Sequence, residues 1–422
     1  MDASIIIIGD EILLGQVVDT NSSEIARTLC RDGWNTVQTI VVGDNEDDIR
    51  FAIEQSLDAS DLVICTGGLG PTKDDITKHV LMSIFGGEEV WRDDVLENVK
   101  RVFAARGLTL NELTRRQALL PTSCQVIQNR LGTAPGMLFR KGAKALISMP
   151  GVPFEAVDML HNGAMPAIRE LFMPDVERRH RTLIVSGITE SDLAEKLATW
   201  EEALPGCLHL AYLPSPGLIR LRLDGVCDTK INLACEFDVV FDRALHELTA
   251  LTGEYLINDG DDEVAEILIN KLRASGLTVA TAESCTGGNI AHAITLVPGC
   301  SDVMKGGVVS YANEVKINLL GVAESDLTAH GAVSREVVTS MAKGVCRATG
   351  AVCSMATSGI AGPGGATPDK PVGTVWIAVH TPRGTRAGCF HLPGSRTRVI
   401  DRATTEAMLM LIKELASASA FQ

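Results

Sequence analysis

The chain has 422 residues, more than one hydrophobic core usually organises, so two or three domains are expected. Hydrophobic residues make up 45% of it but aromatic residues only 4%, which favours aliphatic strands alternating with helices over an aromatic-rich β-sandwich. The net charge of −15 argues against binding to nucleic acid or to an anionic membrane, because such binding usually needs a basic surface. A small-molecule substrate fits this composition better.

The sequence carries no signal for export or for metal-binding thiols. No apolar run reaches the length of a membrane span, and the N-terminus enters the apolar run Ile5–Ile8 without a basic segment, so a cytoplasmic location is expected. The 11 cysteines form no CxxC pair and no Cys/His cluster at metal-ligand spacing. Reduced thiols are therefore predicted rather than disulfides or zinc.

Strands and helices alternate in the N-terminal part of the chain. The pattern predicts strands at Ser4–Ile8, Asn35–Val42 and Asp61–Thr66, and helices at Asn21–Asp32 and Glu46–Ser56. Such alternation predicts a doubly wound parallel sheet with helices on both faces, whose ligands bind beyond the carboxyl ends of the strands. The turns Gly9-Asp10-Glu11 and Gly67-Gly68-Leu69-Gly70 both fall there, and a further strand at Ala145–Met149 leads to the end of this domain.

The pattern changes after the first domain. A small α+β segment is predicted between Arg181 and Gly253, and the polar acidic stretch Asn258–Asp262 is predicted to be a linker. A third, α/β domain then opens with a helix at Val264–Ala274 and a strand at Leu277–Ala282.

A serine follows that strand, at the start of a tight turn that leads into a helix at Asn289–Thr295. A hydroxyl in this position is exposed, and nearby helix N–H groups can stabilise an oxyanion or a phosphate, so Ser284 is a candidate nucleophile. The turn alone equally fits an N-capping residue followed by flexible glycines. Cys285 is a rival nucleophile without an evident histidine partner.

Two further segments supply groups that a serine nucleophile needs. Lys316, after a predicted strand at Gly306–Ser310, is a candidate base because burial lowers the pKa of an amine, and Tyr311 is placed to relay a proton or orient that amine. The loop Ser358–Gly365 is rich in glycine, which allows its backbone N–H groups to approach a phosphate closely. It lacks the Gly-Lys-Ser/Thr sequence with which a P-loop ends. A basic cluster of Arg396, Arg398 and Arg402 offers a guanidinium fork for phosphate or carboxylate.

Four motifs in order resemble the C-terminal domain of the CinA (competence/damage-inducible) family: ESCTGG (283–288), YANEVK (311–316), SGIAGPGG (358–365) and KPVGTVWIAV (370–379). Members of this family include nicotinamide-nucleotide amidohydrolases. The resemblance implies hydrolysis of nicotinamide mononucleotide to nicotinic acid mononucleotide and ammonia through an acyl-enzyme, with no cofactor.

The same resemblance implies the catalytic roles. Ser284 is the nucleophile, Tyr311 and Lys316 assist it, and Arg396 matches an arginine of a late Gly-Asp-Arg segment in which Ser395 replaces the acidic residue. The implied substrate-binding residues of this domain are Thr286, Gly287, Gly288, Ser358, Gly359, Gly362 and Gly364.

Three N-terminal segments resemble motifs of the molybdopterin-binding domain of the MoaB and MogA type: GDEIL (9–13), DTN (19–21) and TGGLGPTKDDIT (66–77). A domain of this type is also the first half of the CinA family. Such domains can hydrolyse ADP-ribose to AMP and ribose 5-phosphate with a divalent metal ion. Carboxylates beside a phosphate-binding turn would repel a phosphate unless a cation lay between them, which agrees with a metal requirement. The predicted substrate-binding residues are Gly67, Gly68, Gly70 and Thr72. The predicted metal ligands are Asp10, Glu11, Asp44, Asp74 and Asp75.

The expected organisation is therefore a MoaB/MogA-like domain at 1–168, a KH-like segment at 169–256 and an amidohydrolase domain at 257–422. No two glycines between Arg181 and Gly253 are three apart, so the middle segment lacks the GxxG loop with which KH domains clamp nucleic acid. It is interpreted as a dimerisation or spacing module, and a homodimer with no nucleic-acid or membrane partner is expected. The alternative is a non-catalytic pterin- or nucleotide-binding adaptor connected with competence or DNA damage.

Overall fold

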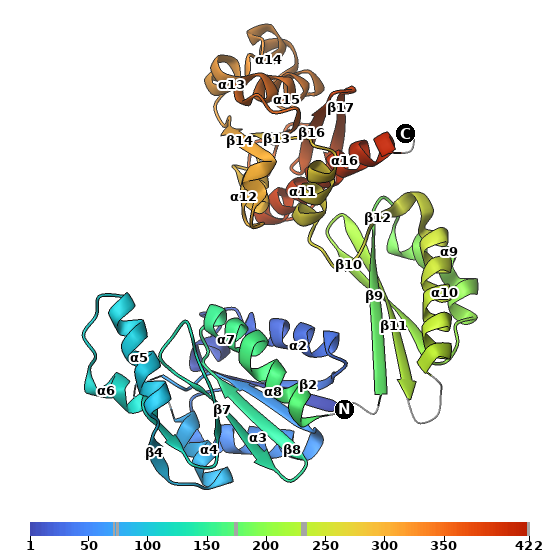
Figure 1. The fold of residues 1–422 in the computed structure, drawn as a ribbon. Coiled ribbons are helices and arrows are strands. Elements are labelled where there is room, and N and C mark those ends of the chain that lie inside the picture. Colours follow the sequence, from blue (N-terminus) through green and yellow to red (C-terminus); the bar gives the residue numbers. More distant parts are fainter. Residues whose placement is uncertain (71, 73–75, 173–175, 229–233, 420–422) are drawn as a thin grey trace. The chain divides into compact units, whose positions relative to one another are not determined.

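The computed structural model describes residues 1–70, 72, 76–172, 176–228 and 234–419. It divides into two compact units, Met1–Arg179 with Val226–Phe237, and His180–Gly225 with Asp238–Gln422. Each unit is described by itself (Figure 1). None of the helices in this described part of the chain is long and apolar enough to cross a membrane.

A six-stranded sheet forms the centre of the first unit, in the order β2-β1-β3-β8-β7-β6. Its strands are β1 (Asp2–Ile8), β2 (Asn35–Val42), β3 (Leu62–Thr66), β6 (Gln125–Ile127), β7 (Gly136–Lys141) and β8 (Lys144–Met149). The first four strands in this order run parallel, as predicted. The last two are antiparallel, which the sequence pattern did not predict. A short pair, β4 (Glu89–Trp91) and β5 (Leu119–Pro121), forms a separate antiparallel ribbon.

Helices cover both faces of this sheet because consecutive strand residues point to opposite sides. In β1, Ile5 and Ile7 pack into one core with helices α2 (Asn21–Arg31), α7 (Pro153–Met159) and α8 (Met165–Leu171). Ile6 and Ile8 pack into the other core with helices α3 (Glu46–Ala59), α4 (Thr77–Phe85) and α5 (Asp93–Ala105). The predicted doubly wound α/β architecture is confirmed. The short helices α1 (Asp10–Leu13) and α6 (Glu112–Arg115) lie outside these layers.

The middle segment is an α+β arrangement. Its sheet has the order β10-β11-β9-β12, and helices α9 (Glu190–Glu202) and α10 (Ala234–Thr252) lie against it (Figure 1). The strands are β9 (Val176–Val185), β10 (Leu208–Ser215), β11 (Leu218–Asp228) and β12 (Leu256–Asp259). Asn258 and Asp259 pair with β9, so the acidic stretch predicted as a linker begins inside a strand. The Asp259 carboxylate accepts a hydrogen bond from Arg181 at 2.6 Å, which accounts for an acidic residue at this sheet edge.

The C-terminal domain contains a five-stranded sheet in the order β14-β13-β15-β16-β17. Its strands are β13 (Val279–Glu283), β14 (Met304–Val309), β15 (Cys353–Gly359), β16 (Thr374–Thr381) and β17 (Gly384–His391). The first three strands in this order are parallel and the last two antiparallel. Helices α11 (Val264–Ala274), α12 (Asn289–Thr295) and α16 (Arg396–Ser419) pack on one face. Helices α13 (Asn313–Leu320), α14 (Glu324–His330) and α15 (Arg335–Thr349) pack on the other.

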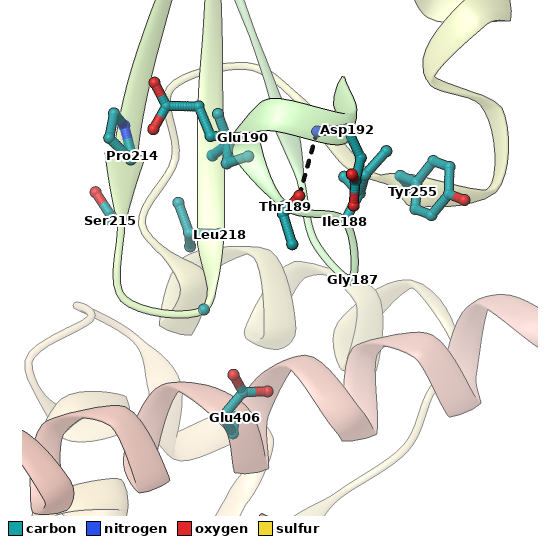
Figure 2. A pocket seen from close by; sticks show the side chains of 12 residues that line it. Gly187, Ile188, Thr189, Glu190, Asp192, Pro214, Ser215, Leu218, Tyr255 and Glu406 are labelled. Atoms are coloured by element: carbon teal, nitrogen blue, oxygen red, sulfur yellow. Dashed lines mark hydrogen bonds between the residues drawn. The ribbon is translucent and has the colours of Figure 1, made fainter. Parts of the chain in front are cut away.

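The middle segment packs on the C-terminal domain within the second unit. Ile184 and Leu218 belong to the same hydrophobic core as α16. A cavity of about 570 Å³ lies beside this junction, and Figure 2 shows Glu406 of α16 on the side opposite the β10–β11 turn. Burial raises the pKa of the Glu406 carboxyl above its usual value. No lysine, arginine or nucleophilic cysteine lines this cavity, so it does not have the groups that the predicted amidase chemistry requires.

Candidate active site

The carboxyl ends of three parallel strands bring the predicted C-terminal motifs together. Glu283, the last residue of β13, pairs with Val309 of β14 on one side and with Thr357 of β15 on the other. Ser284 follows directly, and its N–H donates to the Thr357 carbonyl at 3.0 Å. The ESCTGG, YANEVK and SGIAGPGG segments, distant in the sequence, therefore start at one edge of the sheet.

Lys316 of α13 reaches the nucleophile candidate. Its Nζ lies 3.2 Å from Ser284 Oγ, 2.6 Å from the Ser310 carbonyl oxygen and 3.3 Å from the Tyr311 carbonyl oxygen. The side chain is only 1% exposed, and this burial lowers the pKa of its amine. No carboxylate among the described residues forms an ion pair with it. A buried lysine without a counter-ion is suited to act as a base, because its neutral form is favoured.

Tyr311 and Arg396 form the outer part of the same site. The Tyr311 side chain is 63% exposed, and its hydroxyl accepts a hydrogen bond from Arg396 Nη2 at 2.9 Å. Arg396 Nη1 donates to the Gly362 carbonyl at 2.7 Å and so ties the glycine loop to the tyrosine. The phenol does not contact the amine in the described structure; Tyr311 orients Lys316 through its backbone carbonyl instead. Of the predicted basic cluster, Arg402 lies near Glu406, where its charge opposes the rise that burial causes in the pKa of that carboxyl.

Sequence reasoning missed the role of Glu283. This carboxylate is 1% exposed and accepts four hydrogen bonds: from Thr286 Oγ1 at 2.8 Å and from the N–H groups of Gly288, Ile290 and Ala291 at 3.0, 3.0 and 2.9 Å. A buried carboxylate is stable only when such donors satisfy it. Glu283 thus fixes the turn after Ser284 to the first turn of α12. The only sequence signal was an acidic residue next to the serine at the end of an apolar strand.

Several predicted binding residues have structural partners. The Thr286 hydroxyl is buried and bonds Glu283 and Thr357, and the buried Ser358 hydroxyl donates to the Ala332 carbonyl at 2.7 Å. Gly287 has a φ of +63° and an exposed backbone.

The other predicted glycines differ in their surroundings. Gly288 and Gly362 also have positive φ, whereas a Cβ at Gly359 would lie 2.8 Å from the Thr374 carbonyl oxygen, so Gly359 serves close packing against β16. Gly364 is exposed with open space around it, as a ligand-binding backbone requires.

Cys285 is not a competing nucleophile. Its side chain is buried, and burial raises the pKa of the thiol to about 12. Since the thiolate is the reactive form of cysteine, this thiol is inert at neutral pH.

In the first unit, the glycine turn and two of the predicted carboxylates lie at the carboxyl ends of neighbouring strands. Gly67 and Gly68 have φ of +115° and +62°, and a Cβ on Gly67 would lie 2.0 Å from the Ile8 carbonyl oxygen. Asp10 and Asp44 bridge the ends of β1 and β2: the Asp10 N–H donates to Asp44 Oδ2 at 3.1 Å, and the Asp44 N–H donates to Asp10 Oδ1 at 3.2 Å.

The predicted metal ligands are only partly brought together. The Glu11 carboxylate folds back over Gly9, and Asp74 and Asp75 lie outside the described residues. Within the described ranges, no group of three His, Cys, Asp or Glu residues is arranged to hold a metal ion. Asp10 and Asp44 could therefore supply two ligands of a divalent ion but do not complete a site by themselves. Of the predicted substrate-binding residues, Gly70 and Thr72 line a cavity beside the glycine turn.

Comparison with known proteins matches both halves of the chain to protein families. Residues 261–415 match the family model "CinA C-terminal domain", and residues 4–170 match the model "Probable molybdopterin binding domain". A CinA-like protein of Cytophaga hutchinsonii is 43% identical over 378 residues, which cover 89% of each chain. A CinA-like protein of Flavobacterium psychrophilum is 38% identical over 422 residues, covering 98% of this chain and 99% of that one. A solved structure, the competence/damage inducible protein CihA from Agrobacterium tumefaciens, is 39% identical and covers 36% of this chain and 93% of its own, with a TM-score of 0.35.

Proposed function

Because the chain belongs to the CinA family, we propose that its C-terminal domain is an amidohydrolase that converts nicotinamide mononucleotide and water to nicotinic acid mononucleotide and ammonia. Ser284 is the nucleophile and Lys316 the general base. The proposal depends on the surroundings of one atom, Lys316 Nζ.

A neutral amine has two N–H donors and one lone pair. Two of the three oxygens around Nζ are the carbonyls of Ser310 and Tyr311, which can only accept, at 2.6 and 3.3 Å. When the amine is neutral, both N–H groups donate to these carbonyls, and the lone pair is left for the third oxygen, Ser284 Oγ, at 3.2 Å. The backbone thus orients the base toward the hydroxyl whose proton it must take.

The reaction follows from this arrangement. Ser284 Oγ attacks the carboxamide carbon while Lys316 takes its proton, and a C–O bond forms. Collapse of the tetrahedral intermediate breaks the C–N bond, and Lys316 returns the proton to the departing ammonia. Water then attacks the ester with Lys316 again as base, which releases the carboxylate and restores Ser284.

The oxyanion of the tetrahedral intermediate needs donors in the serine turn. The N–H groups of Ser284, Gly287 and Gly288 already donate to oxygens of the protein. Within the described turn, the N–H groups of Cys285 and Thr286 are not bonded to another residue. These two groups are therefore assigned to the oxyanion, and the exposed loop at Gly364 with Arg396 is assigned to the 5′-phosphate.

The test is ammonia release from nicotinamide mononucleotide by the purified full chain. Ser284→Ala is expected to reduce the rate by at least about 10³-fold, since the substitution removes the attacking atom. Ser325→Ala, at an exposed position of α14, is the matched control and should leave the rate unchanged. Equal ammonia release by the Ser284→Ala protein and the unmodified protein would refute the mechanism. No ammonia release by either protein would favour the adaptor function.

We further propose a metal-dependent hydrolysis of ADP-ribose at the carboxyl edge of the first sheet. The observation in its favour is that Asp10 and Asp44 meet at the same edge as the Gly67–Gly68 turn. A divalent ion held there would neutralise the diphosphate, and the backbone of the turn would contact the phosphate oxygens.

Formation of AMP from ADP-ribose, with and without Mg²⁺ or Mn²⁺, tests this activity. Asp44→Asn is expected to reduce a metal-dependent rate by at least about tenfold, and Asp47→Asn, an exposed neighbour at the start of α3, is the control. Turnover that needs no metal ion would contradict the proposal.

A further inference from the structure

The cavity beside the junction of the middle segment and the C-terminal domain takes no part in either proposed activity. Its volume of about 570 Å³ lies within the roughly 300–1,000 Å³ that small-molecule sites occupy. Strands β10 and β11 line one side of it, the start of α9 lines another, and α16 contributes Glu406 (Figure 2). All of these elements belong to the same compact unit of the chain, so the cavity is a feature of that unit.

Much of the lining of this cavity is apolar. Leu218 and Ile219 of β11 contribute side chains that are otherwise buried in the protein. Ile188 and Pro214 add further apolar groups, and Tyr255 adds an aromatic ring. A ligand with an apolar body would therefore remove hydrophobic surface from water at this place.

The charged groups that line the cavity are all carboxylates. Glu190 and Asp192 lie on the first turn of α9, whereas Glu406 lies on α16 across the space from them (Figure 2). The lining residues that the structure describes include no lysine, arginine or histidine. The three carboxylates are not gathered into one cluster, since no group of three His, Cys, Asp or Glu residues in the described ranges could hold a metal ion. The negative charge is thus divided between two sides of one cavity.

Glu406 has no hydrogen-bond or ion-pair partner in the part of the chain that the structure describes. Its carboxylate lies next to the β10–β11 turn, where a Cβ on Gly217 would be 2.9 Å from Oε1. Lys413 and Arg402 are near enough to oppose the rise in the pKa of this carboxyl, but burial outweighs them. The Lys413 amine itself lies 3.4 Å from the carbonyl oxygen and the hydroxyl of Ser186. A partly buried carboxylate without a partner is unfavourable, so the cavity is suited to a ligand that brings positive charge.

We propose that this cavity binds an aliphatic diamine, with one ammonium group paired with Glu406 and the other with Glu190 and Asp192. The methylene chain between the two ammonium groups contacts the apolar lining and the Tyr255 ring. A monoamine can pair with only one side of the cavity, and a compact dication such as Mg²⁺ has no apolar body to cover the lining. The inference does not depend on either proposed hydrolysis.

The inference is tested by equilibrium titration of the purified full chain with cadaverine and with pentylamine. Both have a five-carbon chain, but cadaverine carries an ammonium group at each end and pentylamine carries only one. The buffer contains physiological salt and Mg²⁺, which screen the general attraction of cations to a protein with a net charge of −15. Cadaverine is expected to bind at least about tenfold more tightly than pentylamine, because its second ammonium group forms a further charge-assisted hydrogen bond.

Substitutions on the two sides of the cavity make the test specific. Glu406→Gln keeps the size of the side chain and removes its charge, so cadaverine binding should fall to the level of pentylamine. The double variant Glu190→Gln with Asp192→Asn removes the charge on the α9 side, at exposed positions, and should have the same effect. It keeps the test decisive in the event that urea denaturation shows Glu406→Gln to be unfolded. Glu336→Gln, at an exposed position of α15, is the matched control and should bind like the unmodified protein.

The outcomes that would overturn the inference are distinct. Equal binding of cadaverine and pentylamine by the unmodified protein, or no binding of cadaverine, would show that the cavity does not take a diamine. A preference for cadaverine that survives in either folded variant of the cavity would place the diamine elsewhere. Loss of the preference in Glu336→Gln as well would show that it reflects the overall negative charge of the protein.

Discussion

Replacing Lys316 by arginine tests the central step of the amidase mechanism. Arginine keeps the positive charge and the ability to donate to the Ser310 and Tyr311 carbonyls, but it is not deprotonated in proteins and cannot act as a base. A positioned general base contributes about 10²- to 10⁴-fold to a rate, so kcat should fall by that factor, about 2.7–5.5 kcal/mol of transition-state stabilisation. KM should change little, since the 5′-phosphate is assigned to the Gly364 loop and Arg396.

The pH dependence supplies an independent measurement of the same group. Only the neutral amine can accept the proton, so kcat/KM should rise with pH and level off above the pKa of Lys316. Because burial lowers this pKa, the midpoint should lie below the ordinary lysine range. Ammonia release is followed over a range of pH, with Lys305→Arg, at an exposed position of β14, as control. An arginine variant that retains more than about a tenth of the activity would refute the reasoning, as would an alkaline midpoint in the ordinary lysine range.

Three other substitutions have expected outcomes at this site. Glu283→Gln replaces one of the two acceptor oxygens by an amide nitrogen, which leaves at least the Ala291 N–H without its acceptor. The substitution should lower the free energy of unfolding by about 1–3 kcal/mol, measured by urea denaturation, with a lower kcat as the turn loosens. Arg396→Lys replaces the two guanidinium nitrogens that reach Gly362 and the Tyr311 hydroxyl separately by a single nitrogen without the planar fork, so kcat/KM should fall by about tenfold or more in steady-state assays; an unchanged value would remove Arg396 from the site. Cys285→Ala should keep activity within about twofold because the thiol pKa is raised to about 12; loss of the rate would point to cysteine chemistry.

Local periodicity predicted the elements that carry the site. Strand β2 at Asn35–Val42 and helix α12 at Asn289–Thr295 have the predicted bounds, because alternation and helix-start signals are short-range properties of the chain. The strands predicted before the serine turn and before the lysine motif correspond to β13 and β14. Their parallel pairing with each other and with β15, which brings the three motifs to one sheet edge, is a finding of the structure.

Features set by distant contacts were not predictable in this way. The antiparallel direction of strands β7 and β16 depends on the neighbour with which each strand pairs, and the residue pattern of an apolar run does not indicate that neighbour. The four bonds of Glu283 and the position of Glu406 at the cavity are likewise outcomes of tertiary packing. In sequence, each of these two residues reads as an ordinary polar residue beside an apolar segment.

The burial of Lys316 also has a consequence for folding. Its pKa is lowered in the folded protein, so between that value and the ordinary lysine pKa the unfolded chain binds more protons than the folded one. The free energy of unfolding therefore contains a contribution that rises with pH across this window, and at lower pH the folded state bears the full cost of a charged, buried amine. A neutral side chain of similar length, as in Lys316→Met, removes that cost together with the activity. The base that the amidase needs is thus a site where stability and catalysis oppose each other.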